Sequence, residues 1–416
     1  MIDGCDTVKL AFQYGTPLYV TNETRIRENF RGYLDALRAH YPYVKVLYAA
    51  KANGNLSILR ILSEEGAGAD VFSAGELHLA LCAGMSPEYL LFNGSSKSES
   101  DHRLAIEKGV RVSLDSLDEL VQLDRLAGEE GKIVEVSFRV NPALDVPTHP
   151  KIATGLATSK FGIPAAEIID AYAAALGCAH VVPVGIHCHI GSQILDIEPF
   201  AQEAQVMMEI VEELHRMGVK FKFIDLGGGL GVAYDHHGPA APSFASYADA
   251  VMPVCTHVLG RLGIQPEIWI EPGRSLVCDS TLLLTRVNSV KKAHKIFVNV
   301  DAGFNLLIRP AMYDAYHEVI VANRADEKPV GLYTITGPIC ETGDILAHER
   351  ELPDVMAGDL IAILDTGAYG YSMASQYNGR GRCAEVLVRN GQSDLMRKAE
   401  TIEDLMRQLV TPSWLQ

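Results

Sequence analysis

A regular alternation of short apolar runs and amphipathic segments constrains the fold of this chain more than any other feature. The apolar runs are rich in β-branched residues, and the segments between them have the helical spacing of apolar positions. We predict strands at 44–50, 69–73, 89–93, 110–115, 133–141, 181–189, 221–226 and 267–271. We predict helices between them at 57–65, 75–83, 98–108, 117–129, 164–176, 199–217 and 243–262. Because alternating strands and helices form a parallel sheet through right-handed crossovers, eight such strands predict a closed (β/α)8 barrel.

The rest of the chain predicts a second domain of a different kind. Beyond residue 277 the runs at 296–300, 330–336, 360–365 and 385–388 follow one another without long helices, and Asn390-Gly391 is typical of a hairpin turn. The strand-like start at 17–20 belongs with these runs, because a closed barrel has no free edge to receive it. We therefore expect an α/β fold: a TIM-like barrel over 20–279, and an antiparallel β domain formed by 1–19 and 280–416.

Two shorter helices are indicated by their caps. Asn22 precedes a segment whose apolar positions have helical spacing, and Thr401 with Asp404 has the spacing of a capping box. The apolar positions of the first helix are Ile26, Phe30, Tyr33, Leu34 and Leu37.

Charge and composition exclude several classes of partner. The net charge is −16, whereas nucleic acids and anionic membranes require a basic face. No apolar run approaches the roughly 18 residues that span a bilayer, and the first sixteen residues lack the features of a signal peptide. The eight cysteines are scattered without a C-x-x-C pair, which favours reduced thiols over a disulfide or zinc site. We expect a cytoplasmic protein with no metal, no membrane contact and no nucleic acid.

The predicted strands end in residues that carry chemistry. These residues are Lys51, Ser73, Asn141, His189, the glycines 227–229 and Glu271. Active sites of such barrels are built where the strands end, and a desolvated lysine there can act as an amine nucleophile. The plainer alternative for Lys51 is a solvated lysine on a loop.

The other strand ends are open to two interpretations each. The glycines after the seventh strand leave backbone N–H groups free to bind a phosphate, although glycines also make tight turns. Glu271 can meet the protonated nitrogen of a pyridine ring, or it can form a structural ion pair with Arg274. His189 can press against an aromatic cofactor, or it can be a core histidine. A zinc site at His187 and His189 is disfavoured, because no further ligands follow at suitable spacing.

An amine nucleophile, a phosphate cradle and an acid placed for a ring nitrogen are together the requirements of one cofactor. That cofactor is pyridoxal 5′-phosphate, carried as a Schiff base on a lysine.

Six ordered motifs resemble those of the diaminopimelate decarboxylases, which are barrel-type pyridoxal phosphate enzymes related to ornithine and arginine decarboxylases and alanine racemases. The resemblance covers nearly the whole chain, from about residue 17 to 404. The motifs are Tyr48-Ala-Ala-Lys-Ala-Asn53, His187-Cys-His-Ile-Gly-Ser-Gln193, Gly227-Gly-Gly-Leu-Gly231, Glu271-Pro-Gly-Arg-Ser275, Arg309-Pro-Ala-Met-Tyr313 and Cys340-Glu-Thr-Gly-Asp344. One departure is Leu306-Leu307, where Asp-Leu or His-Leu is common, and we expect only local repacking from it.

The resemblance implies a role for each matching residue. It makes Lys51 the Schiff-base lysine, His189 the residue stacked on the cofactor ring, and Cys340 the proton donor. It implies cofactor contacts by Ser192, Gly227, Gly228, Gly229, Glu271, Gly273, Arg274 and Tyr369. It implies substrate contacts by Arg274, Arg309, Tyr313, Glu341 and Tyr369.

The activity implied is decarboxylation of meso-2,6-diaminopimelate to L-lysine and CO2, the last step of lysine biosynthesis. The resemblance also implies a homodimer in which Cys340 and Glu341 reach the partner's site. Three alternatives stay open: a decarboxylase of ornithine, arginine, a carboxylated polyamine or carrier-bound glutamate; a racemase of the same fold; and a catalytically silent protein that carries the cofactor.

Overall fold

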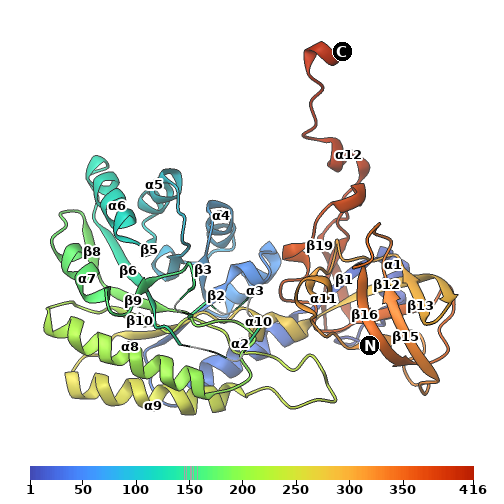
Figure 1. Cartoon of the computed structure of the whole chain (residues 1–416), viewed down its shortest axis with the longest axis horizontal. Helices are drawn as coiled ribbons and strands as arrows, with labels where there is room; N and C mark the ends of the chain where they lie inside the picture. The colour runs from blue at the N-terminus through green and yellow to red at the C-terminus, as the bar shows by residue number, and fades with distance from the viewer. Residues whose placement is uncertain (145, 147, 150–151, 153, 157) are drawn as a thin grey trace. The chain divides into compact units, whose positions relative to one another are not determined.

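The computed structural model describes residues 1–144, 146, 148–149, 152, 154–156 and 158–416 (Figure 1). The chain divides into two compact units. The barrel unit comprises residues 26–233 and 240–276, and the β unit comprises residues 1–25, 234–239 and 277–416. Among the described residues, no helix combines the length and apolar character needed to cross a membrane.

The barrel unit contains the predicted closed ring of eight parallel strands. The ring runs β2–β3–β4–β5–β6–β9–β10–β11, and β11 pairs with β2 to close it. Its strands are β2 (Val44–Ala49), β3 (Gly68–Val71), β4 (Leu90–Phe92), β5 (Arg111–Leu114), β6 (Val134–Asn141), β9 (Gly185–Cys188), β10 (Phe223–Asp225) and β11 (Glu267–Ile270). Short strands β7 (Ile163–Pro164) and β8 (Val181–Pro183) also pair with β6. The predicted strand at 181–189 is thus two strands, β8 and β9, which meet just after Pro183, a residue without an N–H for the ladder.

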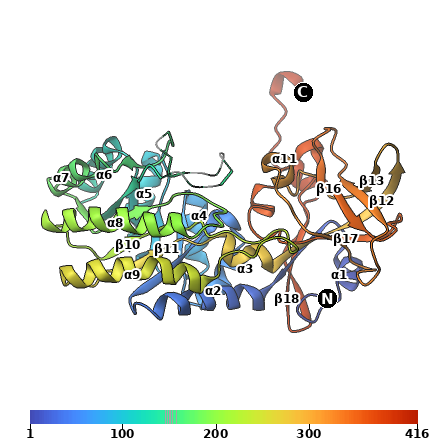
Figure 2. The same cartoon turned by 60° about the horizontal axis from the view of Figure 1, so that its bottom comes forward.

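Helices follow the strands as the spacing predicts, and Figure 2 shows α8 and α9 lying side by side along the barrel. The helices are α2 (Glu23–Arg38), α3 (Leu56–Glu64), α4 (Ala74–Cys82), α5 (Glu99–Lys108), α6 (Leu117–Glu129), α7 (Ile168–Leu176), α8 (Glu198–Arg216), α9 (Phe244–Leu262) and α10 (Arg274–Val277), with single 3₁₀ turns η1 (Ala50–Ala52) and η2 (Pro87–Tyr89). Ser73 and Ser116 cap α4 and α6 in the same way, each accepting from the N–H of a glutamate three residues later. These caps fix where each helix begins after its strand.

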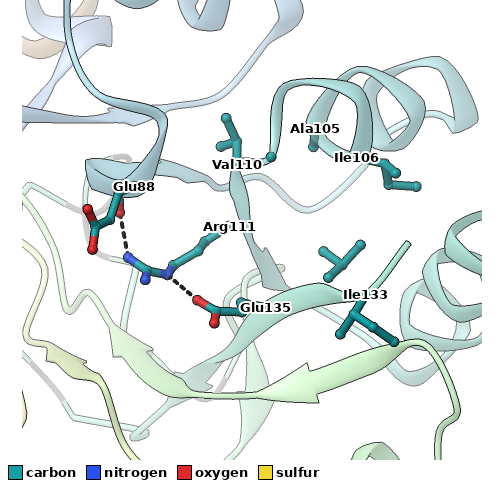
Figure 3. Close-up of a pocket in the computed structure, with 9 residues that line it drawn as sticks. Glu88, Ala105, Ile106, Val110, Arg111, Ile133 and Glu135 are labelled. Atoms are coloured by element: carbon teal, nitrogen blue, oxygen red, sulfur yellow. Dashed lines mark hydrogen bonds and ion pairs between the residues drawn. The ribbon is translucent and has the colours of Figure 1, made fainter. Parts of the chain in front are cut away.

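The amino end of the barrel is closed by an aromatic plug. The Phe223 and Trp269 rings stack with centroids 3.9 Å apart, and the Arg111 guanidinium lies 5.4 Å from the Trp269 ring. Beside it, a pocket of about 390 Å³ opens at the start of β5 and β6 (Figure 3). Arg111 donates to Glu135 Oε2 at 2.9 Å and to the Glu88 carbonyl there. In such barrels this end serves stability, whereas the carboxyl end carries the chemistry.

The β unit is one nine-stranded sheet, and it includes the N-terminal strand as predicted. β1 (Leu18–Asn22) pairs antiparallel with β12 and parallel with β18. The other strands are β12 (Thr281–Lys292), β13 (Ile296–Val300), β14 (Val319–Val321), β15 (Gly331–Thr336), β16 (Ile345–Leu352), β17 (Leu360–Ile363), β18 (Ala384–Arg389) and β19 (Gln392–Arg397). Most pairs are antiparallel, but β1–β18 and β13–β15 are parallel, so the sheet is mixed.

Turns and caps complete the β unit. Asn390 and Gly391, both at positive φ, close the β18–β19 hairpin, and Thr401 with Asp404 forms the predicted capping box. Leu306 and Leu307 are fully packed in the apolar core, which accommodates the departure from the usual motif. The remaining elements are α1 (Thr7–Tyr14), α11 (Arg309–Tyr313), α12 (Ile402–Met406), η4 (Cys278–Ser280), η5 (Tyr371–Met373), η6 (Tyr377–Gly379) and η7 (Ser413–Leu415).

Candidate active site

Lys51 lies in η1, immediately beyond the carboxyl end of β2. Its Nζ donates to Asp70 Oδ2 at 2.5 Å and lies 4.2 Å from the centroid of the Phe72 ring. The Lys51 side chain is 32% exposed, whereas that of Asp70 is fully buried. The amine is therefore held at the rim by a buried carboxylate and is still reachable from outside.

A chain of hydrogen bonds leads from Lys51 across the strand ends to Glu271. Asn93 Nδ2 donates to Asp70 Oδ1 at 2.7 Å and to Glu271 Oε1 at 2.8 Å. Asp70 lies next to the end of β3, Asn93 and Glu271 directly follow β4 and β11, and all three are buried. The amine and the acid predicted from sequence thus share one connected polar network.

Glu271 is held as a carboxylate despite its burial. Burial raises its pKa, but the neighbouring His187, which lies 3.2 Å away through Nε2, and the charge of Lys51 outweigh this effect. The net result lowers the pKa of Glu271 to about 2. His187 is itself fixed by Ser113 Oγ, 3.1 Å from its Nδ1.

Asp225, at the end of β10, is a second buried acid close to Glu271. Burial and the charge of Glu271 raise the pKa of Asp225 well above its usual range. Asp225 Oδ1 accepts from the Gly227 N–H at 2.8 Å. His187, Asp225 and Glu271 have ligand atoms within 4.8 Å of one another, a spacing that a metal could bridge. The hydrogen bond between His187 and Glu271 and the one from the Gly227 N–H to Asp225 account for the cluster without a metal.

The glycines after β10 let three strand ends approach closely. A Cβ at Gly228 would lie 2.1 Å from the Glu271 carbonyl oxygen, and one at Gly229 would lie 2.5 Å from the Gly191 oxygen. Gly227 has φ 63°, where its own Cβ would meet the Cys188 oxygen at 2.2 Å. This packing accounts for the glycines as a tight turn, so the phosphate interpretation depends on further observations.

His189 is a neutral, oriented ring. Burial, followed by the charges of Arg139 and Lys51, lowers its pKa well below the usual value. The Gly228 N–H donates to His189 Nδ1 at 3.2 Å, which places the ring hydrogen on Nε2. Near it, Arg274 Nη2 donates to Ser192 Oγ at 3.1 Å. A neutral imidazole and this Arg–Ser pair therefore flank the glycine turn.

The predicted substrate contacts other than Arg274 belong to the β unit. Arg309 is buried at the start of α11, where its Nη1 donates to His317 Nε2 at 2.8 Å and its guanidinium lies 4.4 Å from the Tyr234 ring centroid. Tyr313 ends α11. Tyr369 has a positive φ of 58° in the segment after β17. Arg309 is thus oriented by a histidine and an aromatic face.

Cys340 and Glu341 lie on the turn between β15 and β16, and both are exposed. The thiol accepts a hydrogen bond from Asn378 Nδ2 at 3.2 Å, and Glu341 accepts one from the Tyr377 hydroxyl. Cys340 and Glu341 are thus predicted residues that do not belong to the hydrogen-bond network around Lys51.

Comparison with known proteins decides the family. Residues 24–278 match the family model of the pyridoxal-binding domain of pyridoxal-dependent decarboxylases. The diaminopimelate decarboxylase of Archaeoglobus fulgidus is 50% identical over 414 residues, covering 100% of this chain and 97% of that protein. The one from Methanothermobacter thermautotrophicus is 43% identical, covering 100% and 96%. The crystal structure of the M. jannaschii diaminopimelate decarboxylase gives a TM-score of 0.95 at 39% identity, covering 100% and 97%.

This chain belongs to the diaminopimelate decarboxylase family. As a pyridoxal-dependent decarboxylase it is a carboxy-lyase whose cofactor is pyridoxal 5′-phosphate. The predicted fold class and cofactor are confirmed.

A second lysine, Lys97, is buried as a reactive amine would be, but its surroundings differ from those of Lys51. Burial lowers the pKa of Lys97, which follows β4. Its Nζ donates to the carbonyl oxygens of Gly94 and Ser113 at 2.6 and 2.7 Å and lies 2.7 Å from Glu119. Because three acceptors match its three N–H donors, Lys97 is a structural lysine.

Sequence reasoning missed Asp70, Asn93 and Lys97. Asp70 and Asn93 lie at or near the ends of predicted strands, and this position was their only local signal. Their importance depends on partners 19, 23 and 178 residues away in the chain, which only the closed ring brings together.

A buried acid on α8, Glu203, makes the stability of the folded chain depend on pH. Burial raises the pKa of Glu203 on α8 from 4.5 to about 8, where it shares a hydrogen bond with Cys188. Between pH 4.5 and about pH 8 this carboxyl group is deprotonated in the unfolded chain and still protonated in the folded chain. The free energy of unfolding therefore falls by about 1.4 kcal/mol per pH unit over this range. Glu203→Gln removes this loss. We expect the variant to be more stable than the parent at pH 8, by roughly 4 kcal/mol, and equally stable near pH 4.5.

Circular dichroism melting at the two pH values checks this expectation. Glu209→Gln, an exposed position on the same helix, is the matched control and should shift neither curve. An equal gain for Glu203→Gln at both pH values would contradict a neutral buried acid.

Proposed function

We propose that this chain decarboxylates meso-2,6-diaminopimelate to L-lysine and CO2, with pyridoxal 5′-phosphate linked to Lys51. The observation that carries the proposal is the network from Lys51 through Asp70 and Asn93 to Glu271. It connects an accessible amine to a buried carboxylate that stays ionised, and these two groups are what the cofactor's aldehyde and ring nitrogen require. Full-length similarity to diaminopimelate decarboxylases supports the substrate.

The bound cofactor supplies an electron-withdrawing ring for the electron pair that departing CO2 leaves behind. Lys51 holds the cofactor's aldehyde carbon, and Asp70 keeps the amine oriented. Glu271, ionised and fixed by His187 and Asn93, stabilises a proton on the ring nitrogen. The neutral His189 ring offers an apolar face against which the cofactor ring lies.

The glycine turn 227–229, together with Gly273, Arg274 and Ser192, lines the phosphate site. The N–H groups of Gly227 and Gly228 donate to Asp225 and His189, so within the turn the Gly229 N–H is the donor to the phosphate. The fit is supported by the absence of side chains on the turn and by the Arg274–Ser192 hydrogen bond beside it. A cation and unobstructed N–H groups are the usual donors to phosphate.

The β unit supplies the substrate's other contacts. Diaminopimelate carries a second carboxylate, which a guanidinium binds in bidentate fashion, and a second ammonium, which a carboxylate binds. Arg309, with Tyr313 and Arg274, takes the distal carboxylate, Glu341 takes the ammonium, and Tyr369 contacts substrate and cofactor. A relative from M. jannaschii was crystallised with L-lysine, which supports a site shaped for the product.

Cys340 returns a proton to the carbon that has lost CO2. Its exposure on a turn suits a residue that completes the active site of a second subunit, so we propose a homodimer. We also propose that the protein is cytoplasmic. All eight cysteines lie in the described part of the chain and form no disulfide there, which suits a reducing compartment.

The test is CO2 release from the protein supplied with cofactor and one of four substrates: meso-diaminopimelate, ornithine, arginine or lysine. We expect release only from diaminopimelate, with one lysine formed per CO2. Release from ornithine but not from diaminopimelate would overturn the substrate assignment.

Arg309→Lys tests the distal carboxylate contact. A lysine keeps the charge but loses the bidentate geometry, so we expect KM for diaminopimelate to rise about 10- to 100-fold while kcat changes less. Arg324→Lys, which alters a structural pair with Asp359 in the same unit, is the control and should leave KM unchanged. An unchanged KM in Arg309→Lys would remove Arg309 from the substrate site.

A further inference from the structure

The turn that carries Cys340 is anchored at its base by one buried carboxylate. Asp344 accepts from the Ile339 N–H through Oδ2 and from the Phe304 N–H through Oδ1, both at 2.6 Å. The Asp344 N–H donates to the Glu341 carbonyl at 3.0 Å, which closes the turn. The backbone around Cys340 is therefore fixed, and what remains to be set is the direction of its thiol.

A second segment, η6, reaches the tip of this turn from elsewhere in the β unit. The Cys340 N–H donates to Asn378 Oδ1 at 3.0 Å, and Asn378 Nδ2 donates to Cys340 Sγ at 3.2 Å. The Tyr377 hydroxyl donates to Glu341, and the Tyr377 ring stacks on Phe304 with centroids 5.8 Å apart. Two adjacent residues of η6 therefore contact the two adjacent residues of the turn.

The backbone N–H of Cys340 determines which way the Asn378 amide faces. Only Oδ1 can accept from that N–H, so the donor Nδ2 must face the sulfur. An amide nitrogen in this position has no lone pair for the thiol hydrogen. The S–H bond therefore points away from Asn378, and its proton stays available to a substrate.

The backbone of Asn378 favours asparagine for this task. Its φ of 58° and ψ of 25° lie in the left-handed region. Asparagine and glycine adopt that region at low cost, but only asparagine also carries an amide. Glycine at this position would keep the turn and remove the contact with the thiol.

We propose that Asn378 is a positioning residue that orients the Cys340 thiol so that its hydrogen is directed to the substrate carbon. The proposal rests on the proposed role of Cys340 as proton donor. The two reciprocal hydrogen bonds between Asn378 and Cys340 support it. Tyr377 does the same for Glu341 by holding its carboxylate in one direction.

The first test needs no catalysis. Cofactor-free enzyme is alkylated with iodoacetamide, and modification of Cys340 is followed by mass spectrometry, with the exposed Cys82 as internal reference. The thiolate is the reacting form, and an N–H donated to sulfur stabilises it. We expect Asn378→Gly to slow alkylation of Cys340 about fivefold. Asn378→Asp keeps the acceptor for the Cys340 N–H but replaces the donor by a carboxylate, so it should slow alkylation about tenfold or more.

The second test follows where the proton goes in the loaded enzyme. If the thiol hydrogen is misdirected, the electron pair left by CO2 takes a proton at the cofactor's aldehyde carbon instead of the substrate carbon. Water then releases an aldehyde, and the amino group stays on the cofactor as pyridoxamine 5′-phosphate. We expect the ratio of lysine to CO2 to fall below one in Asn378→Gly and further in Asn378→Asp. The missing lysine should be recovered as aldehyde.

Asn390→Gly is the matched control, because Asn390 is a left-handed asparagine at φ 49° in the β18–β19 hairpin. It should match the parent in both tests. Parent-like alkylation and parent-like lysine yield in Asn378→Asp would overturn the positioning role. Cys340→Ala separates the two proposals: full activity and full lysine yield in that variant would remove Cys340 as donor, whereas a defect there with normal Asn378 variants would overturn the positioning role alone.

Discussion

Lys51→Ala should lose CO2 release from diaminopimelate by about 10³-fold or more, and it should lose the visible absorbance of the lysine-linked cofactor. The amine both links the cofactor and moves protons near it, and such groups contribute about 10²–10⁴ each to the rate. Steady-state CO2 release and an absorbance spectrum of the protein loaded with pyridoxal 5′-phosphate measure the two effects.

Lys45→Ala is the matched control, because Lys45 lies on β2, the strand that leads to Lys51, with its ammonium 3.4 Å from the centroid of the Tyr89 ring. It should keep both the activity and the spectrum. A Lys51→Ala protein with the parent's spectrum would show that another lysine carries the cofactor.

Glu271→Gln should lower kcat by about 10²–10³, the size of effect seen when a preorganised electrostatic partner is removed. The pKa of Glu271 is lowered to about 2, so the parent has a full negative charge at this position at all working pH values. The amide has none and cannot stabilise the ring-nitrogen proton. A shift of the cofactor's absorbance maximum should accompany the loss in rate.

Asp225→Asn is the control for the charge at the neighbouring acid. Burial and the charge of Glu271 raise the pKa of Asp225 well above its usual range, which favours its neutral form, and asparagine has nearly the same shape without a charge. We expect kcat within about threefold of the parent. A large loss in Asp225→Asn with little loss in Glu271→Gln would mean that the proton sits on Glu271 instead.

The barrel could be predicted because its signal is local and repeated. Each strand of the ring is a short buried run, and α6 (Leu117–Glu129) agrees with its prediction at both ends. The elements that were missed lack such a signal. β12 is buried at its start and exposed at its end, so its residues show no simple alternation. The helix α1 is short, although Asp6 caps it by accepting from the Val8 and Lys9 N–H groups.

Only those site residues that stand at the ends of predicted strands could be found from the residue pattern. The positions of Lys51, His189 and Glu271 follow from where the apolar runs stop. The network that connects them needs Asp70 and Asn93, whose partners are far away in the chain. His236 lies on an exposed loop, and its Nε2 lies 2.8 Å from Asp365, a partner 129 residues away that no local pattern indicates. Burial raises the pKa of Asp365 to about 6.

The central claim is that the cofactor is bound covalently to the amine at the end of β2. Borohydride reduction of the loaded protein makes that link permanent, and peptide mass spectrometry then locates it. We predict a single pyridoxyl label, on the peptide that contains Lys51. A label on the peptide that contains Lys97, or on no lysine, would contradict the account.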